Sequence, residues 1–230
     1  RVNDSWVQLG NDIEGEAAYD EFGAAVAWSL DGQRLAIGAP FNDGNGFDAG
    51  HVRVFQYTGT AWVRLGAAID GEAAYDESGG SVSLSSRGNR LAVGARFNDG
   101  SAGFDAGHTR VYQWSGMSWE RLGDDIEGEA AYDESGGSVS ISNNGNLLFI
   151  GAHRNDGGGL NAGHGRIYMW SGSGWNQFGD DIDGVAPEDA AGFSVSLAAF
   201  GNQLAIGAPL HDGNGIDSGH TRVFDIDLNA

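Results

Sequence analysis

The chain has 230 residues, a length compatible with one large all-β domain. Its 40 glycines, 3 prolines and 40% hydrophobic residues are typical of a folded chain with many tight turns rather than of a disordered polymer. The formal net charge of −20 argues against binding to nucleic acids or anionic membranes, and no apolar run approaches the roughly 18–20 residues that cross a bilayer. The absence of cysteine excludes disulfides and thiolate chemistry.

One unit occurs four times along the chain. Tryptophans mark it at nearly equal steps: Trp6, Trp62, Trp119 and Trp175. The repeats run over residues 6–61, 62–118, 119–174 and 175–226, and we interpret residues 1–230 as a single domain.

Each repeat predicts four β-strands. In the first repeat these are SWVQLG (5–10), GAAVAWSL (23–30), RLAIGA (34–39) and HVRVFQY (51–57), and the last alternates in polarity as a strand does. Short turns at DGQ and TGT suit hairpins, and no segment shows a helical period. Four antiparallel strands in such a repeat are typical of a β-propeller blade, so we predict an all-β propeller of four four-stranded blades.

The order of the strands raises the question of closure. The chain begins with an outermost strand and the fourth repeat lacks one, so we expect residues 5–10 to complete the last blade and close the ring. The alternative is that these residues pair with a second copy of the chain, which would build a filament.

Two short motifs resemble a known family. Phe22-Gly23 and Gly38-Ala39-Pro40 contain both halves of the FG-GAP repeat, the blade unit of integrin α-subunit propellers and of many secreted microbial and algal surface proteins. The spacing from the glycine of the first motif to that of the second is the same in all four copies. The resemblance implies an extracellular or cell-surface propeller that serves adhesion or recognition, usually without catalysis. The integrin calcium loop lies between the first two strands, where this chain has only LDGQR, so that site is not carried over.

The acidic residues gather in two kinds of loop. The loop before the innermost strand and the loop that ends in Gly-His together hold 27 of the 32 acidic residues. Up-and-down strands place both kinds of loop on one face of a propeller. Crowded like charges destabilise a fold unless cations, arginines or hydrogen bonds compensate them.

Calcium is one possible compensation, because it prefers carboxylate, amide and carbonyl oxygens such as those in NDGNGFDAGH. The candidate Ca²⁺ ligands in the second kind of loop are Asp43, Asn45, Asp48, Asp99, Asp105, Asp156, Asn161, Asp212 and Asp217. Asn-Gly and Asp-Gly pairs also stabilise turns by themselves, so a purely structural role of these residues stays open.

A hydrogen-bonded network between blades is the second compensation. A histidine lies two residues before an arginine in every repeat, and an Asp or Asn lies three residues before each histidine. Arginine can fork onto a carboxylate, so we expect these residues to be structural: His51, Arg53, His108, Arg110, His164, Arg166, His220 and Arg222.

The first kind of loop, DIEGEAAYDESG in the third repeat, carries more charge and is the better candidate for contact with a protein or glycan partner. The predicted contact residues are Glu16, Asp20, Glu21, Glu72, Asp76, Glu77, Glu129, Asp133 and Glu134.

Catalysis is not expected, because the polar residues recur with the repeat and form no nucleophile, base and orienter set. The function that we predict is a non-catalytic extracellular adhesion, assembly or recognition module. The alternatives are a carbohydrate-binding propeller, suggested by seven tryptophans, and a subunit of an extracellular filament.

Overall fold

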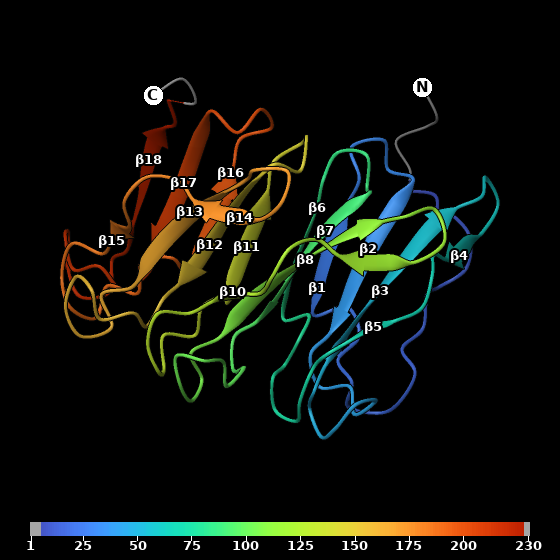
Figure 1. Cartoon of the computed structure of the whole chain (residues 1–230), viewed down its shortest axis with the longest axis horizontal. Helices are drawn as coiled ribbons and strands as arrows, with labels where there is room; N and C mark the ends of the chain where they lie inside the picture. Colours follow the sequence, from blue (N-terminus) through green and yellow to red (C-terminus); the bar gives the residue numbers. More distant parts are fainter. Residues whose placement is uncertain (1–5, 228–230) are drawn as a thin grey trace.

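The protein is all-β, with four antiparallel sheets of the propeller type (Figure 1). The computed structural model describes residues 6–227, and no helix in this part of the chain could span a membrane. The strands of the first two sheets are β1 (Ala25–Trp28), β2 (Arg34–Ala39), β3 (His51–Tyr57), β4 (Trp62–Arg64), β5 (Ile69–Asp70), β6 (Ser81–Leu84), β7 (Arg90–Ala95), β8 (His108–Trp114), β9 (Trp119–Arg121) and β10 (Ile126–Glu127). Those of the last two are β11 (Ser138–Ile141), β12 (Leu147–Ala152), β13 (His164–Trp170), β14 (Trp175–Gln177), β15 (Ile182–Asp183), β16 (Ser194–Leu197), β17 (Gln203–Ala208) and β18 (His220–Asp225).

Each sheet is one blade, and its strands follow chain order from the inside outward. The innermost strands β1, β6, β11 and β16 lie side by side in that order. The outermost position holds two short strands instead of one, because β4 and β5 both pair with β3 at different heights, and β9 with β10 and β14 with β15 repeat this arrangement. Glycines between the two short strands, such as Gly66 at φ 84°, allow the chain to bend there.

Apolar side chains fill the spaces between neighbouring blades. Between the first two blades, Val52 and Val54 of β3 pack with Leu91 and Val93 of β7. Similar clusters join the second blade to the third and the third to the fourth. Stability therefore depends on stacking one blade upon the next.

The glycines of the FG-GAP motif lie where blades approach most closely. A Cβ atom on Gly38 would lie 2.9 Å from the carbonyl carbon of Gly79 in the next blade, and Gly94 and Gly151 stand in the same relation to Gly136 and Gly192. Only a residue without a side chain fits such an approach. Each blade thus has one motif glycine just before its innermost strand and a second on the next strand. The second glycine of one blade contacts the first glycine of the following blade.

The expected closure of the ring by residues 5–10 is not found in the part of the chain that the structure describes. In the described residues the fourth sheet has three strands, and residues 6–9 form none, while Arg1–Ser5 lie outside the description. The N-terminal segment lies against the first blade, where Trp62 Nε1 donates to the Leu9 carbonyl at 2.9 Å. The same bond joins Trp119 to Leu65 and Trp175 to Leu122. The segment thus packs on the first blade as the later outer segments pack on the blades that follow them.

The first and fourth blades therefore lie at opposite ends of a row (Figure 1). A Cβ atom on Gly23 would meet nothing within 4 Å, and one on Gly207 would meet only Ser194 of its own hairpin. The glycine contact that joins the other blades is missing between these two. The fold is a four-blade propeller unit that is open in the described residues.

Candidate functional site

The two kinds of acidic loop lie beside each other, along the lower side of the view in Figure 1. The backbone of Gly50 forms a bridge with Ser78, and Tyr75 N and Glu77 N donate to the carbonyls of Phe47 and Asp48 at 2.8 and 3.1 Å. The same contacts join the loops at the next blade. We call this surface, made by residues 9–23, 40–50 and their equivalents in the later repeats, the acidic loop face.

The candidate calcium ligands make turn contacts. Asp43 Oδ1 accepts a hydrogen bond from the backbone N–H of Asp48 at 2.9 Å, and Asp48 has φ of 51°. Asn45 donates from its amide to the carbonyls of Gly71 and Glu72. The Asp43 contact recurs at 2.9, 2.8 and 2.8 Å in the pairs Asp99–Asp105, Asp156–Asn161 and Asp212–Asp217. The first aspartate of each pair thus stabilises the loop through one carboxylate oxygen, and its side chain is exposed to solvent.

The three aspartates among the predicted partner-binding residues are buried. Asp20, Asp76 and Asp133 are at most 4% exposed and accept hydrogen bonds from the amides of Asn42, Asn98 and Asn155 at 2.8–2.9 Å. Each also accepts a backbone N–H three residues before it. These aspartates hold the two loops together from the inside, so they are not available to a partner.

The glutamates of the same loop pair with the arginines. Glu16 lies 3.2 Å from Arg53, Glu129 lies 3.1 Å from Arg166, and Glu72 contacts Arg110. Arg110 also forks onto Asp125, with Nε and Nη2 each 2.8 Å from one carboxylate oxygen. The arginine partners are therefore these acids and not the Asp or Asn that precedes each histidine by three residues.

The histidines lie inside the blades. His51, His108 and His164 are at most 2% exposed. Burial, followed by the charge of the neighbouring arginine, lowers the pKa of His51, and lowers the pKa of His108 and His164 to about 4. At neutral pH all three are uncharged.

The third glutamate of the loop lies near the inner end of the blades. Glu21 and Glu77 line a cavity of about 200 Å³ with Arg96, which lies 3.0 Å from Glu77. Glu134 lies 3.0 Å from Arg154 and is itself buried. Burial raises the pKa of Glu77 and Glu134, against the opposing charge of the arginines.

Exposed aromatic pairs on the acidic loop face were missed from the sequence. Phe47 lies 5.5 Å from Tyr75, and Phe104 lies 5.6 Å from Tyr132, measured between ring centroids. All four side chains are more than half exposed. The tyrosines have φ of 72° and 69°, where bulky residues are rare. The signal was present in the sequence, because Phe and Tyr recur at fixed places in FDAG and AAYDE.

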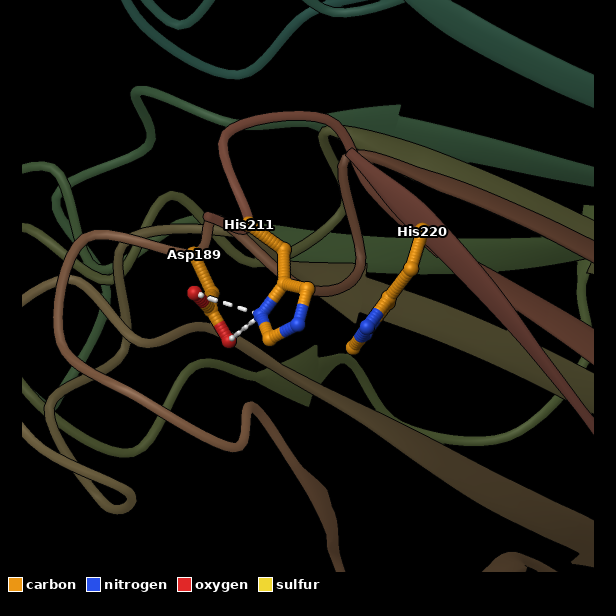
Figure 2. Close-up of side chains that lie close together, drawn as sticks. All are labelled: Asp189, His211 and His220. Atoms are coloured by element: carbon orange, nitrogen blue, oxygen red, sulfur yellow. Dashed lines mark hydrogen bonds and ion pairs between the residues drawn. The ribbon is translucent and has the colours of Figure 1, made fainter. Parts of the chain in front are cut away.

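In the fourth repeat, a histidine takes the place of the asparagine that donates to the buried aspartate in the first three repeats. Figure 2 shows His211 between Asp189 and His220, with its Nδ1 3.1 Å from both oxygens of Asp189. Each of these three residues offers one ligand atom within 4.8 Å of the others. Two further groups of this kind occur in the described residues, Glu72–His108–Asp125 and Glu129–His164–Asp181, and in both an arginine already pairs with the glutamate.

One of the four repeats matches the model of a known protein family. The family model described as FG-GAP repeat matches residues 14–55, which run from the first acidic loop through β3. The chain contains an FG-GAP repeat. The other blades have the same order of strands. The close contacts between glycines of neighbouring blades explain why the motif has glycine at these positions. No curated protein matches the chain.

Two solved structures are similar to this chain in fold. One is a Bacteroides uniformis protein titled "putative 6-phosphogluconolactonase", with a TM-score of 0.59 and 11% identity over 89% of this chain and 50% of that one. The other is Kuenenia stuttgartiensis hydrazine synthase, with a TM-score of 0.54 and 11% identity over 94% of this chain and 49% of that one. The chain thus spans about half the length of each, and the likeness shows the fold alone.

Proposed function

We propose that the chain is a non-catalytic, extracellular or cell-surface module that recognises a partner through its acidic loop face. The observation that carries the proposal is the pair of exposed aromatic contacts, Phe47–Tyr75 and Phe104–Tyr132, set among exposed carboxylates on neighbouring blades. Rigid aromatic anchors that are surrounded by polar groups are typical of recognition surfaces. The FG-GAP repeat supports the extracellular setting.

The partner surface that we propose is basic and apolar. Glu16, Glu72 and Glu129 are already paired with arginines, whereas Asp43 and Asp99 are exposed in the same loops as Phe47 and Phe104. A protein with basic residues around an apolar patch would neutralise the free carboxylates and cover the rings.

The binding test uses beads coated with the chain and arrays of extracellular matrix proteins and glycans. We expect Tyr75→Ala with Tyr132→Ala to reduce retention on a matrix protein at least about tenfold, as loss of central aromatic anchors does. Phe200→Ala is the matched control, because Phe200 is 83% exposed in the turn between β16 and β17, at the end of the blade away from the acidic loops. Equal loss in both variants, or unchanged retention in the tyrosine variant, would refute the proposed surface.

We propose calcium as part of the same face. Asp43 uses Oδ1 for the turn, so its other oxygen and the Asp48 carboxylate are the available donors, and hard oxygen donors fit Ca²⁺. Calcium would supply positive charge between loops that are crowded with carboxylates. We expect excess Ca²⁺ to raise the Tm relative to EDTA, and Asp43→Asn with Asp99→Asn to reduce that rise. An identical Tm in both solutions would contradict calcium binding. It would not bear on the aromatic surface, which the binding experiment tests separately.

The same array separates the carbohydrate alternative from the protein partner. Aromatic rings also stack on sugars, so the Phe–Tyr pairs fit a glycan as well. Retention on glycans that survives high salt would favour a lectin, whereas retention on a protein that falls with salt favours the acidic surface.

Self-assembly is a second candidate function, and the open ends of the blade row favour it. β18 has no outer strand among residues 6–227, Val223 on it is 67% exposed, and the equivalent Ile167 is buried under the fourth blade. At the other end Val26 and Trp28 of β1 are more than half exposed. Because each blade packs onto the next through these surfaces, two copies could stack head to tail.

Light scattering after size-exclusion chromatography tests this assembly. We expect the mass to rise with concentration, and Val223→Lys to lower it to one chain. A mass of one chain at every concentration contradicts assembly.

A further inference from the structure

A buried aspartate has a different partner in the fourth blade. In the first three repeats Asp20, Asp76 and Asp133 accept a hydrogen bond from an asparagine amide. Asp189 is the equivalent residue and is 2% exposed, but the asparagine position is His211. Asp189 also accepts the Ala186 N–H at 3.0 Å, so its carboxylate is fixed in place.

A second imidazole lies next to the first. The ring centroids of His211 and His220 are 4.0 Å apart, and Figure 2 shows His220 on the side of His211 that faces away from Asp189. His220 Nε2 is buried and has no hydrogen-bond partner among the described residues. A buried nitrogen without a partner is costly, so this atom is suited to a ligand.

We propose that Asp189, His211 and His220 form a binding site for a divalent transition-metal ion of the Zn²⁺ class. Two imidazoles and a carboxylate are the donor set that such ions prefer, whereas Ca²⁺ prefers oxygen alone. The site uses imidazole donors and the buried Asp189, none of which belongs to the calcium proposal, and it does not depend on the proposed function.

A groove of about 470 Å³ is lined in part by His220. Metal–ligand bonds of about 2.0–2.2 Å require the three donor atoms to lie closer together than their present limit of 4.8 Å, so we expect the two imidazoles to rotate when the ion binds.

The alternative is that His211 only replaces asparagine as a hydrogen-bond donor to Asp189. The variant His211→Asn separates the two explanations, because asparagine already occupies this position in the other three repeats. It should keep the hydrogen bond to the aspartate and the fold. It removes one of the two imidazoles.

Isothermal titration of the chain with ZnCl₂ tests the site, with CaCl₂ as a separate titration. We expect one Zn²⁺ per chain and a loss of affinity of at least about tenfold in His211→Asn. His153→Asn is the matched control, because it makes the same substitution outside the site, and it should bind as the unchanged chain does. His220→Gln leaves the Asp189–His211 bond intact and should also lose the metal, which keeps the test valid if His211→Asn fails to fold.

Two results would overturn the metal site. One is the absence of Zn²⁺ binding by the unchanged chain. The other is equal Zn²⁺ affinity in the unchanged chain, His211→Asn and His220→Gln, which would place the ion elsewhere and leave His211 as a hydrogen-bond donor only.

Discussion

Replacing Gly94 by alanine should disrupt the junction between the second and third blades. The new Cβ atom would lie 2.9 Å from the carbonyl carbon of Gly136 and closer still to its oxygen. Rotation of a side chain cannot relieve this clash, because the obstacle is backbone. Gly136 is also held by its N–H bond to the Gly151 carbonyl at 3.1 Å and by the Ser81 hydroxyl, which donates to its carbonyl at 2.7 Å.

The expected cost follows from these contacts. Overpacking of a well-packed site costs about 1–3 kcal/mol, and loss of the Ser81 bond adds about 1 kcal/mol. Replacing glycine in a strand returns about 0.5–1 kcal/mol. The net loss of unfolding free energy is about 1–3.5 kcal/mol, or roughly 2–14 °C in Tm for a chain of this size.

Gly207 provides the matched control, because it pairs with Ser194 as Gly94 pairs with Ser81 but has no following blade in the described residues. Gly207→Ala should change the unfolding free energy by less than about 1 kcal/mol in either direction. Urea unfolding followed by tryptophan fluorescence measures both variants. Equal losses would refute the interpretation that the motif glycines serve contact between blades.

Three further predictions concern the buried polar groups. Arg110→Ala should cost about 1–3 kcal/mol in urea unfolding, because Glu72 loses its arginine partner and Asp125 keeps only Arg121, and an unchanged midpoint contradicts the network. Asn98→Ala should cost about 1–3 kcal/mol by removing a donor to buried Asp76, and an unchanged midpoint would show that water replaces it. His108 and His164 have a pKa of about 4 in the fold against an ordinary 6.5, so the unfolded chain takes up protons first as the pH falls. Each contributes up to about 3 kcal/mol that is present above pH 6.5 and lost between pH 6.5 and 4. Imidazole NMR signals that titrate near pH 6.5 would contradict this.

Repetition in the sequence was sufficient to predict the blades. Tryptophans at nearly equal steps and strands of alternating polarity are local properties, and they predicted the inner three strands of each blade. They also placed the two kinds of acidic loop on one face, because that follows from the up-and-down order of the strands.

The partner of each polar side chain was decided by tertiary structure. The sequence GEAAYDE looks like an exposed acidic segment, yet its aspartate turns inward to an asparagine of the neighbouring loop and its first glutamate pairs with an arginine of the same blade. Exposure could not be deduced from residue type, because a carboxylate can be buried when a fixed amide satisfies it.

The repeat pattern of the sequence could not predict whether the ring closes either. The repeat shows that residues 6–9 resemble an outer segment, but it does not show which blade they touch. The bond from Trp62 to Leu9 places them on the first blade, and the outer edge of β18 stays without a strand in the described residues. The sequence by itself determined the blade and the composition of its loops, while the stacking of the blades determined which carboxylates face solvent and where Asp189, His211 and His220 meet, since both depend on contacts between residues far apart in the chain.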